Sequence, residues 1–348
     1  MNLAFMDENF GIIKYFKYIN LQWTRRYYEP GEFSVQLPAS EYVNGCVYLY
    51  TKDRPEVGII QKREYADGYD GSVMQLSGYF FEYKLNDKIT FPRFSGSGNI
   101  ETLARSIVST YKADIPLLQL GTAAGLGISI TKQSTGDGLA TVLYAMLKTQ
   151  ELSFRCVYDY EANIMSFEVW QGKDRTQDQS TNSFVTFSES FRNLQNEVIT
   201  IDNSNYKNYA VVIGNGTYEE GQQIQVDVDL RADPSDYKQI LYVDQTGMHY
   251  DSGEQSLSDY KAQLRQAGIE ALEKYTDITN VQFETINRGL QYLVDYDLGD
   301  RCDIILDSIH ESYTVRITEI EEVFKSGQHS VTLQFGDKVP TVYTKSRR

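Results

Sequence analysis

The 348-residue sequence is poor in cysteine, and this limits the covalent and metal-based ways in which it can be stabilised. Its three cysteines, Cys46, Cys156 and Cys302, lie far apart, with no CxxC pair and no histidine beside them. A disulfide framework or a zinc site needs closer, paired thiols. We therefore expect three reduced core residues, of the kind made in a cytoplasm.

Basic residues are also few, and this argues against a nucleic-acid-binding surface. The chain has 33 Lys and Arg against 48 Asp and Glu, a formal net charge of -15. A phosphate-binding surface needs clustered Lys and Arg, and the one cluster, Lys345-Ser346-Arg347-Arg348, is interpreted as part of a disordered tail over residues 341–348. We expect no sequence-specific nucleic-acid binding. An acidic channel, in contrast, would repel a DNA duplex and let it slide.

Targeting and membrane-spanning segments are not apparent in the sequence. The first ten residues, MNLAFMDENF, have no basic region, and they carry Asp7 and Glu8 where a signal peptide would be apolar. The longest uncharged run, residues 115–131, is interrupted by Gln119 and by glycines, so it is too polar to span a bilayer. We expect neither a signal peptide nor a membrane anchor.

The sequence contains no recognisable catalytic or nucleotide-binding motif. His249, His310 and His329 stand without a local acid and nucleophile pattern, and Gly-x-Ser-x-Gly, HExxH and a P-loop are all missing. The glycine-rich stretch 121–127 lacks the Lys-Ser/Thr pair that holds phosphate and metal, so we interpret it as a turn before a strand. We expect no catalytic residue, no cofactor and no metal site, with the histidines at the surface or in turns.

Two groups of acidic residues need a separate interpretation. One group contains Asp295, Asp297, Asp300 and Asp303. A calcium loop also needs a central Gly and a terminal Glu at fixed positions, which Gly299 does not provide, so a structural turn is favoured. The pairs Glu219-Glu220 and Glu321-Glu322 cannot serve glycoside hydrolysis, because adjacent strand residues point to opposite faces; we expect them to be solvated.

The most regular stretch of the sequence is residues 292–336, which predicts three consecutive antiparallel strands. A turn at residues 297–300 leads into an apolar run. Two runs with strict alternation follow it. The apolar positions of the three runs are Cys302, Ile304 and Ile305, then Tyr313, Val315 and Ile317, then Val331, Leu333 and Phe335. Alternation with a period of two is typical of half-buried strands, here those of a small barrel.

The first half of the chain predicts a β domain followed by a mixed domain. Residues 1–92 contain short runs rich in Tyr, Val, Ile and Phe, separated by turn residues, and this favours a first β-barrel. Residues 93–187 change to helical spacing at 100–111, behind Asn99 as a cap, and again at 139–147. We expect an α+β inserted domain there, ending in an exposed polar loop at 171–183.

Residues 188–340 predict a second β-barrel domain that also contains a helix. Strands near 188–230 are expected to complete the first barrel as well. In one of them, apolar residues alternate with Asp227 and Asp229, so that one face is acidic. Residues 256–275 have helical spacing, and Ser256 with Asp259 imitates a capping box. The predicted fold class is mainly β with an α+β insertion: two small antiparallel barrels plus mixed α/β subdomains.

Both ends of the chain resemble a known family of phage proteins. Residues 23–38, WTRRYYEPGEFSVQLP, resemble a segment of siphophage tail hub or tail-tip proteins, and the stretch from 292 to 336 resembles the second barrel of phage tail baseplate hubs. The two stretches make up under a fifth of the chain, but their order and spacing place the family's fold over nearly all of it. The residues that carry the resemblance are Gly31, Phe33, Pro38, Tyr296, Gly299, Asp300, Phe335 and Gly336.

The resemblance implies a structural hub at the tail tip of a phage or prophage. Such a hub is a homotrimer with two barrels per protomer around a DNA channel, and it joins the tail tube and distal tail protein to tape-measure and tip or receptor-binding proteins. Asp227 and Asp229 are predicted to line the channel. Many relatives extend past the hub into a peptidase, lysin or receptor-binding region, whereas this sequence stops about ten residues after Phe335-Gly336, so we expect this chain not to be an enzyme. Its expected location is the virion tail tip, after assembly in the host cytoplasm.

Two other functions fit the composition. The 27 tyrosines are the one compositional excess, and tyrosine suits sugar platforms and protein interfaces as well as ordinary strand packing. A carbohydrate- or receptor-binding β protein of a virion is therefore the main alternative, which a glycan array would distinguish from a hub. An acid-dependent glycoside hydrolase is a third hypothesis, which activity on wall polysaccharides would test.

Overall fold

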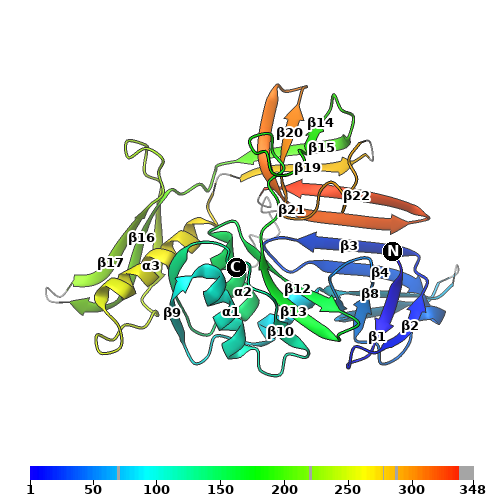
Figure 1. The fold of residues 1–348 in the computed structure, drawn as a ribbon, viewed down its shortest axis with the longest axis horizontal. Helices are drawn as coiled ribbons and strands as arrows, with labels where there is room; N and C mark the ends of the chain where they lie inside the picture. Colours follow the sequence, from blue (N-terminus) through cyan, green and yellow to red (C-terminus); the bar gives the residue numbers. More distant parts are fainter. Residues whose placement is uncertain (69–70, 219–221, 277, 287–288, 337–348) are drawn as a thin grey trace.

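The computed structural model describes residues 1–68, 71–218, 222–276, 278–286 and 289–336 (Figure 1). Within these ranges the chain is mainly β, with a mixed part in the middle, and this confirms the mainly β part of the predicted class. None of the helices in these ranges is both long enough and apolar enough to cross a membrane. The predicted basic tail, residues 341–348, lies outside the described residues.

The amino-terminal part consists of two sheets whose apolar faces share a core. Its elements are β1 (Leu3–Met6), β2 (Ile12–Phe16), β3 (Asn20–Arg26), β4 (Glu32–Pro38), η1 (Ala39–Glu41), β5 (Tyr48–Tyr50), β6 (Gly58–Ile59), β7 (Lys62–Ala66), β8 (Val73–Tyr79) and η2 (Phe81–Asp87). One sheet has the order β2-β1-β5-β6, and β3, β4, β8 and β7 are neighbours in a larger one. Phe5 from the first sheet and Trp23 and Val35 from the second lie in one buried cluster, because alternation turns the apolar side chains of each strand inward.

The middle part packs two helices against a small sheet. Its elements are β9 (Phe94–Asn99), α1 (Ile100–Tyr111), β10 (Leu118–Leu120), β11 (Ser129–Ser134), α2 (Leu139–Lys148), β12 (Ser153–Asp159) and β13 (Ile164–Trp170). The predicted cap of α1 is confirmed, since Asn99 Oδ1 accepts hydrogen bonds from the N–H groups of Glu101 and Thr102 at 3.0 and 3.2 Å. The core of this part also takes in Met6 and Val57, so it is continuous with the amino-terminal part.

A third part has its own core and lies to one side of the molecule (Figure 1). It consists of β16 (Tyr209–Tyr218), β17 (Gln222–Asp229), β18 (Ile240–Gln245) and α3 (Leu257–Leu272), with the sheet order β17-β16-β18. The predicted start of α3 is confirmed, because Ser256 Oγ accepts a bond from the Asp259 N–H at 3.0 Å. Gly268 lets α3 approach the sheet: a Cβ there would lie 2.6 Å from Val212 and 2.7 Å from Val228.

The carboxy-terminal part contains the three strands that the alternation predicted. Its elements are β14 (Thr186–Ser188), β15 (Leu194–Asp202), β19 (Ile278–Thr285), β20 (Arg301–Leu306), β21 (Glu311–Lys325) and β22 (Gln328–Phe335). β20, β21 and β22 pair antiparallel in sequence order, as predicted. Val331, Leu333 and Phe335 are buried on one face of β22, because their alternation places them all on the core side.

The two ends of the chain meet in one continuous sheet. Its path is β15-β19-β22-β21-β3-β4-β8-β7, so the amino-terminal strand β3 lies directly beside the carboxy-terminal strand β21 (Figure 1). The ladder between them pairs all of β3, from Asn20 opposite Lys325 to Arg26 opposite Glu319. Segments about 300 residues apart in sequence thereby form a single β layer.

The structure modifies two predictions about strand pairing. Closed barrels are not confirmed, because each sheet among the described residues ends in edge strands; β7 and β15 are the ends of the large one. The expectation that strands near 188–230 complete the amino-terminal barrel stays a prediction, but none of them in the described ranges pairs with β3, which lies between β4 and β21. β15 joins the same sheet only beyond β19, β22 and β21. Alternation identifies the buried face of a strand but not the strand beside it.

The prediction of an exposed loop at 171–183 is wrong for part of that stretch. The backbone of Asp174 forms an isolated parallel β-bridge with that of Arg301, and Arg175 and Thr176 are buried. These residues are polar but have partners inside the protein, with Arg175 bonded to Asp300. Polar composition predicts exposure only when such partners are missing.

Candidate functional site: a buried polar junction

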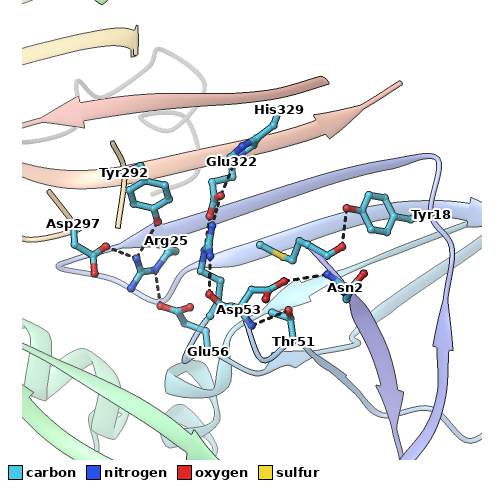
Figure 2. Close-up of polar contacts among 12 residues, drawn as sticks. Asn2, Tyr18, Arg25, Thr51, Asp53, Glu56, Tyr292, Asp297, Glu322 and His329 are labelled. Carbon is cyan, nitrogen blue, oxygen red and sulfur yellow. Dashed lines mark hydrogen bonds and ion pairs between the residues drawn. The ribbon is translucent and has the colours of Figure 1, made fainter. Parts of the chain in front are cut away.

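Arg25 lies at the centre of the contact between the two ends of the chain. It is on β3 and is 3% exposed. Its Nε donates to Glu56 at 2.6 Å, and one terminal nitrogen donates to Asp297 at 2.5 Å and to the Tyr292 hydroxyl at 3.0 Å (Figure 2). A buried guanidinium is stable only when its donors are satisfied in this way. Arg25 thus connects the amino-terminal sheet to the 289–300 segment.

Glu322 on β21 is the second centre of the same contact. It is fully buried, and Arg54 donates hydrogen bonds to both of its carboxylate oxygens, at 2.7 and 2.5 Å. His329 Nε2 lies 3.0 Å from one of these oxygens. Burial alone would raise the pKa of Glu322, but the bonds from His329 and Arg54 outweigh it, and the pKa is lowered. The prediction that the Glu321-Glu322 pair is solvated is therefore wrong for Glu322. Glu219-Glu220 lies outside the described residues.

We call the residues of these two centres the polar junction; its members are Arg25, Arg54, Glu56, Tyr292, Asp297, Glu322 and His329.

A small cavity adjoins Arg25 where the amino-terminal, middle and carboxy-terminal parts meet. It has a volume of about 20 Å³, and its lining includes Glu56, Glu82 and Tyr144. Glu82 Oε1 accepts the Cys156 N–H at 2.9 Å, whereas Oε2 of Glu82 and Oε2 of Glu56 are buried with no protein partner. Burial raises the pKa of Glu82 to about 7. The space is enough for one water molecule.

The predicted turn around Gly299 and Asp300 is confirmed as a structural turn. Asp300 is buried and accepts bonds from the backbone of Lys173 at 2.7 Å and from Arg175 Nε at 2.6 Å. Gly299 has φ +82, and a Cβ there would lie 2.5 Å from the Tyr27 ring. Glycine is needed both for the backbone conformation and for this close approach.

The remaining motif residues have packing roles. Phe33 is buried in the amino-terminal core, Pro38 ends β4, and Gly31 fits against Phe80 where a Cβ would clash. In the carboxy-terminal core, Tyr296 and Phe335 both contact the Phe187 ring. Gly336 follows β22, and its N–H bonds to the carbonyl of Arg316.

Asp227 and Asp229 lie on the face of β17 that is turned away from α3. Both are exposed, but each carboxylate has a hydrogen-bond partner. Asp229 is bonded to Arg231 at 2.7 Å, which lowers its pKa to about 2, and Asp227 accepts a bond from the Tyr209 hydroxyl at 2.7 Å, which also lowers its pKa. On β18, Tyr242 is exposed on the same sheet, so this face is mixed rather than uniformly acidic.

Among the described residues, one cluster brings together metal-ligating side chains. His249, Asp251 and Glu254 place one ligand atom each within 4.8 Å of one another. Arg93 already contacts Glu254 Oε2 at 2.7 Å, and a bound cation would have to displace it. The three cysteines are free and buried, as predicted, and burial raises the pKa of Cys156 and Cys302 well above the ordinary range.

Sequence reasoning did not find the polar junction, although its members are ordinary charged and aromatic residues. Two signals were available. Arg25 follows Leu21 and Trp23 at the buried alternate positions of β3, and Glu322 falls at a core position of β21, in line with the buried Ile320. Charged residues at apolar positions of a strand indicate buried partners, but they do not say where in the chain those partners lie.

The overall fold is one that occurs in tail proteins of phages and prophages. A tail protein from Neisseria meningitidis MC58 aligns with a TM-score of 0.60 and 11% identity, over 97% of this chain and 96% of that one. The 43 kDa tail protein of prophage MuSo2 from Shewanella oneidensis gives 0.59 and 12%, over 96% and 98%. Prophage tail protein gp18 from Listeria monocytogenes EGD-e gives 0.56 and 11%, over 100% and 98%.

The particular family follows from the sequence. Residues 6–337 match the model of the Siphovirus ReqiPepy6 Gp37-like protein family, so the chain belongs to this siphovirus tail protein family. No curated protein matches the chain. The predicted resemblance to siphophage tail proteins is thereby confirmed, and the protein is located in the virion tail.

Proposed function

We propose that this protein is the structural hub of the tail tip. In this proposal three copies form a ring that joins the tail tube and distal tail protein to the tape-measure and tip or receptor-binding proteins, and DNA passes through its centre. The observation that carries the proposal is that one tail-protein fold extends over nearly the whole chain, within a siphovirus tail family. The role is mechanical, and no catalytic residue is assigned.

A mechanical adaptor needs rigid connections between its parts, and the polar junction supports this. The β3–β21 ladder and the contacts of Arg25 and Glu322 join both ends of the chain. We propose four regions: a β domain at 1–92, an α+β domain at 93–187, a second β domain at 188–340 and the tail at 341–348. In the proposed ring, the two β domains of each protomer occupy the places of the two barrels of a hub protomer, so that three protomers arrange six β domains around the channel.

The proposed ring also needs a surface that lines its channel. Asp227 and Asp229 are its candidate residues, and their exposure supports the assignment. The Arg231 partner of Asp229 weakens the expected repulsion of DNA, because the pair is nearly neutral. If both carboxylates lie on the outer rim in a map of the assembled ring, this assignment is rejected.

The test is electron microscopy of the purified full chain at high concentration, with its mass measured in solution. The expected result is a threefold ring with a central hole and three copies of the 39.9 kDa chain, about 120 kDa. A monomer, both alone and after addition of tail tubes, would contradict the hub. Specific binding on a glycan array would instead favour the receptor-binding alternative.

A further inference from the structure

We propose that the groove between α3, β11 and β17 binds an extended acidic segment of another polypeptide chain, which adds as a strand to the free edge of β11. The groove has a volume of about 1070 Å³, enough for several peptide residues. Its lining includes Ser129, Thr131, Gln225, Asp227, Lys261 and Arg265. This proposal does not depend on the ring, because the groove lies within one chain.

The first observation is that two strand edges border the groove. Among the described strands, β11 pairs only with β9, and β17 pairs only with β16. The consecutive residues 128–131 line the groove on one side, and residues 225–227 line it on the other. Side chains alternate between the faces of a strand, so consecutive residues can border one groove only along the backbone edge. An edge of this kind is a template for another strand.

The alternation of hydrogen bonds along the β9–β11 ladder shows which backbone groups of β11 lie on the free edge. The Ile100 N–H bonds to the Ile128 carbonyl, so Ile128 belongs to the set of residues that bond toward β9. In an antiparallel ladder this set alternates with residues whose N–H and C=O point away from the partner strand. Ser129 and Thr131 belong to the second set and therefore present their backbone groups to the groove.

The second observation is the charge of the helix that forms the groove wall. Lys261 and Arg265 of α3 line the groove, one helical turn apart, in a chain of net charge -15. Four residues of helix advance about 6 Å, and two residues of strand advance about 6.8 Å. A strand laid along α3 can therefore place carboxylates at every second residue opposite the two cations.

The same charges indicate β11, rather than β17, as the edge that receives the segment. The same alternation applies to β17. The Leu230 N–H bonds to the Asn208 carbonyl, so Leu230 and every second residue before it bond toward β16. Gln225 and Asp227 belong to the other set and turn their backbone groups to the free edge of β17. Asp227 would repel an acidic segment placed beside it, whereas the free-edge positions of β11, Ser129, Thr131 and Gln133, carry no charge. The basic tail of this chain, residues 341–348, would be repelled by Lys261 and Arg265.

The test uses labelled ten-residue peptides and fluorescence anisotropy with the full chain. The peptides alternate Thr with Asp, with Asn or with Lys. We expect the Asp peptide to bind at least tenfold more tightly than the other two, and Arg265→Glu to weaken its binding at least tenfold. Arg192→Glu is the matched control, since Arg192 is exposed outside the groove, and it should leave binding unchanged. Equal binding of the Asp and Lys peptides, or no effect of Arg265→Glu, overturns the proposal.

Hydrogen exchange then tests the edge itself. Bound Asp peptide should slow amide exchange in residues 128–134, because Ser129 and Thr131 gain hydrogen-bond partners. Slowing in residues 222–229 instead would assign the segment to β17 and overturn the choice of edge. Circular dichroism of both variants checks that they are folded. A monomeric protein that still binds the Asp peptide would reject the proposed hub and leave this inference standing.

Discussion

Glu82 shows how a single buried carboxyl is controlled by its surroundings. It is enclosed by the middle part of the chain and faces Glu56, Arg25 and the Tyr144 ring across the small cavity. Burial disfavours its charged form, so the proton is retained in the folded state up to about pH 7. In the unfolded chain the same group loses its proton near its ordinary pKa of 4.5.

The first prediction concerns Glu82→Gln. Because the folded-state pKa of Glu82 is raised, this group lowers the unfolding free energy of the wild type as the pH rises from 4.5 to about 7, by roughly 1.4 kcal/mol per pH unit. The variant lacks this loss, so relative to the wild type it should gain about 3 kcal/mol between pH 4.5 and pH 8. Denaturant unfolding across this pH range measures the difference. Glu161→Gln, at an exposed site, is the control, and equal pH profiles of wild type and Glu82→Gln would refute the assignment.

The second prediction concerns Glu322, which the sequence pattern placed at the surface. Glu322→Ala leaves Arg54, whose side chain is 9% exposed, without its carboxylate partner, so it should cost about 3–5 kcal/mol of unfolding free energy at neutral pH. Since the pKa of Glu322 is lowered, this contribution exists above the unfolded-state pKa and is lost as the pH falls through the folded-state value. The neighbouring Glu321→Ala should cost under about 1 kcal/mol. Similar losses in both variants would contradict the role of Glu322.

Elements in this protein are positioned by small residues as much as by apolar faces. Gly268 lets α3 lie against β16 and β17, and Gly299 lets the 297–300 turn approach Tyr27. Both are glycines because no space for a Cβ remains. The close approach at Gly299 connects the carboxy-terminal turn to β3 and its following residues.

The third prediction compares two glycines with similar backbones. Gly299 has φ +82 and Gly327 has φ +77, but a Cβ would meet other atoms within 4 Å only at Gly299. Gly327→Ala should therefore cost only the backbone strain, about 1 kcal/mol, and Gly299→Ala should cost at least about 2 kcal/mol more because of the clash with Tyr27. Thermal and denaturant unfolding measure both. Equal losses would show that the clash is relieved at no cost.

At the scale of the whole molecule, the β3–β21 ladder makes the two ends of the chain one structural unit. The large sheet continues across this ladder, and Arg25 and Glu322 lie on the two strands that form it. The carboxy-terminal core even includes Tyr27, which directly follows β3. We therefore expect the two ends to unfold together rather than as separate domains.

The fourth prediction tests this cooperativity. Amide exchange in residues 20–26 and 319–325 should report the same opening free energy, because each strand protects the other. Arg25→Met should lower both values together by about 3–5 kcal/mol, since Glu56 and Asp297 lose their buried partner. Arg63→Met, in a strand away from the junction, should change them little. Loss of protection in only one segment would show that the two ends open independently.

The sequence by itself determined the strands and helices whose residues obey a local rule. The alternation of Val331, Leu333 and Phe335, the Asn99 and Ser256 caps and the Gly299 turn are consequences of neighbouring residues, so they were predicted. The siphovirus tail family was likewise predicted from short segments at the two ends of the chain. For the strands, the caps and the turn, the physical cause lies within a few residues, whereas the family was predicted from a resemblance.

Only the tertiary structure decided which strands lie side by side and which charges are buried. Nothing local in β3 selects β21 as its neighbour, and nothing local in Glu322 shows that Arg54, 268 residues away, is its partner. The free edges of β11 and β17 became visible only when every other pairing was known. Register and partner choice depend on the packing of the whole chain, which short-range patterns do not encode.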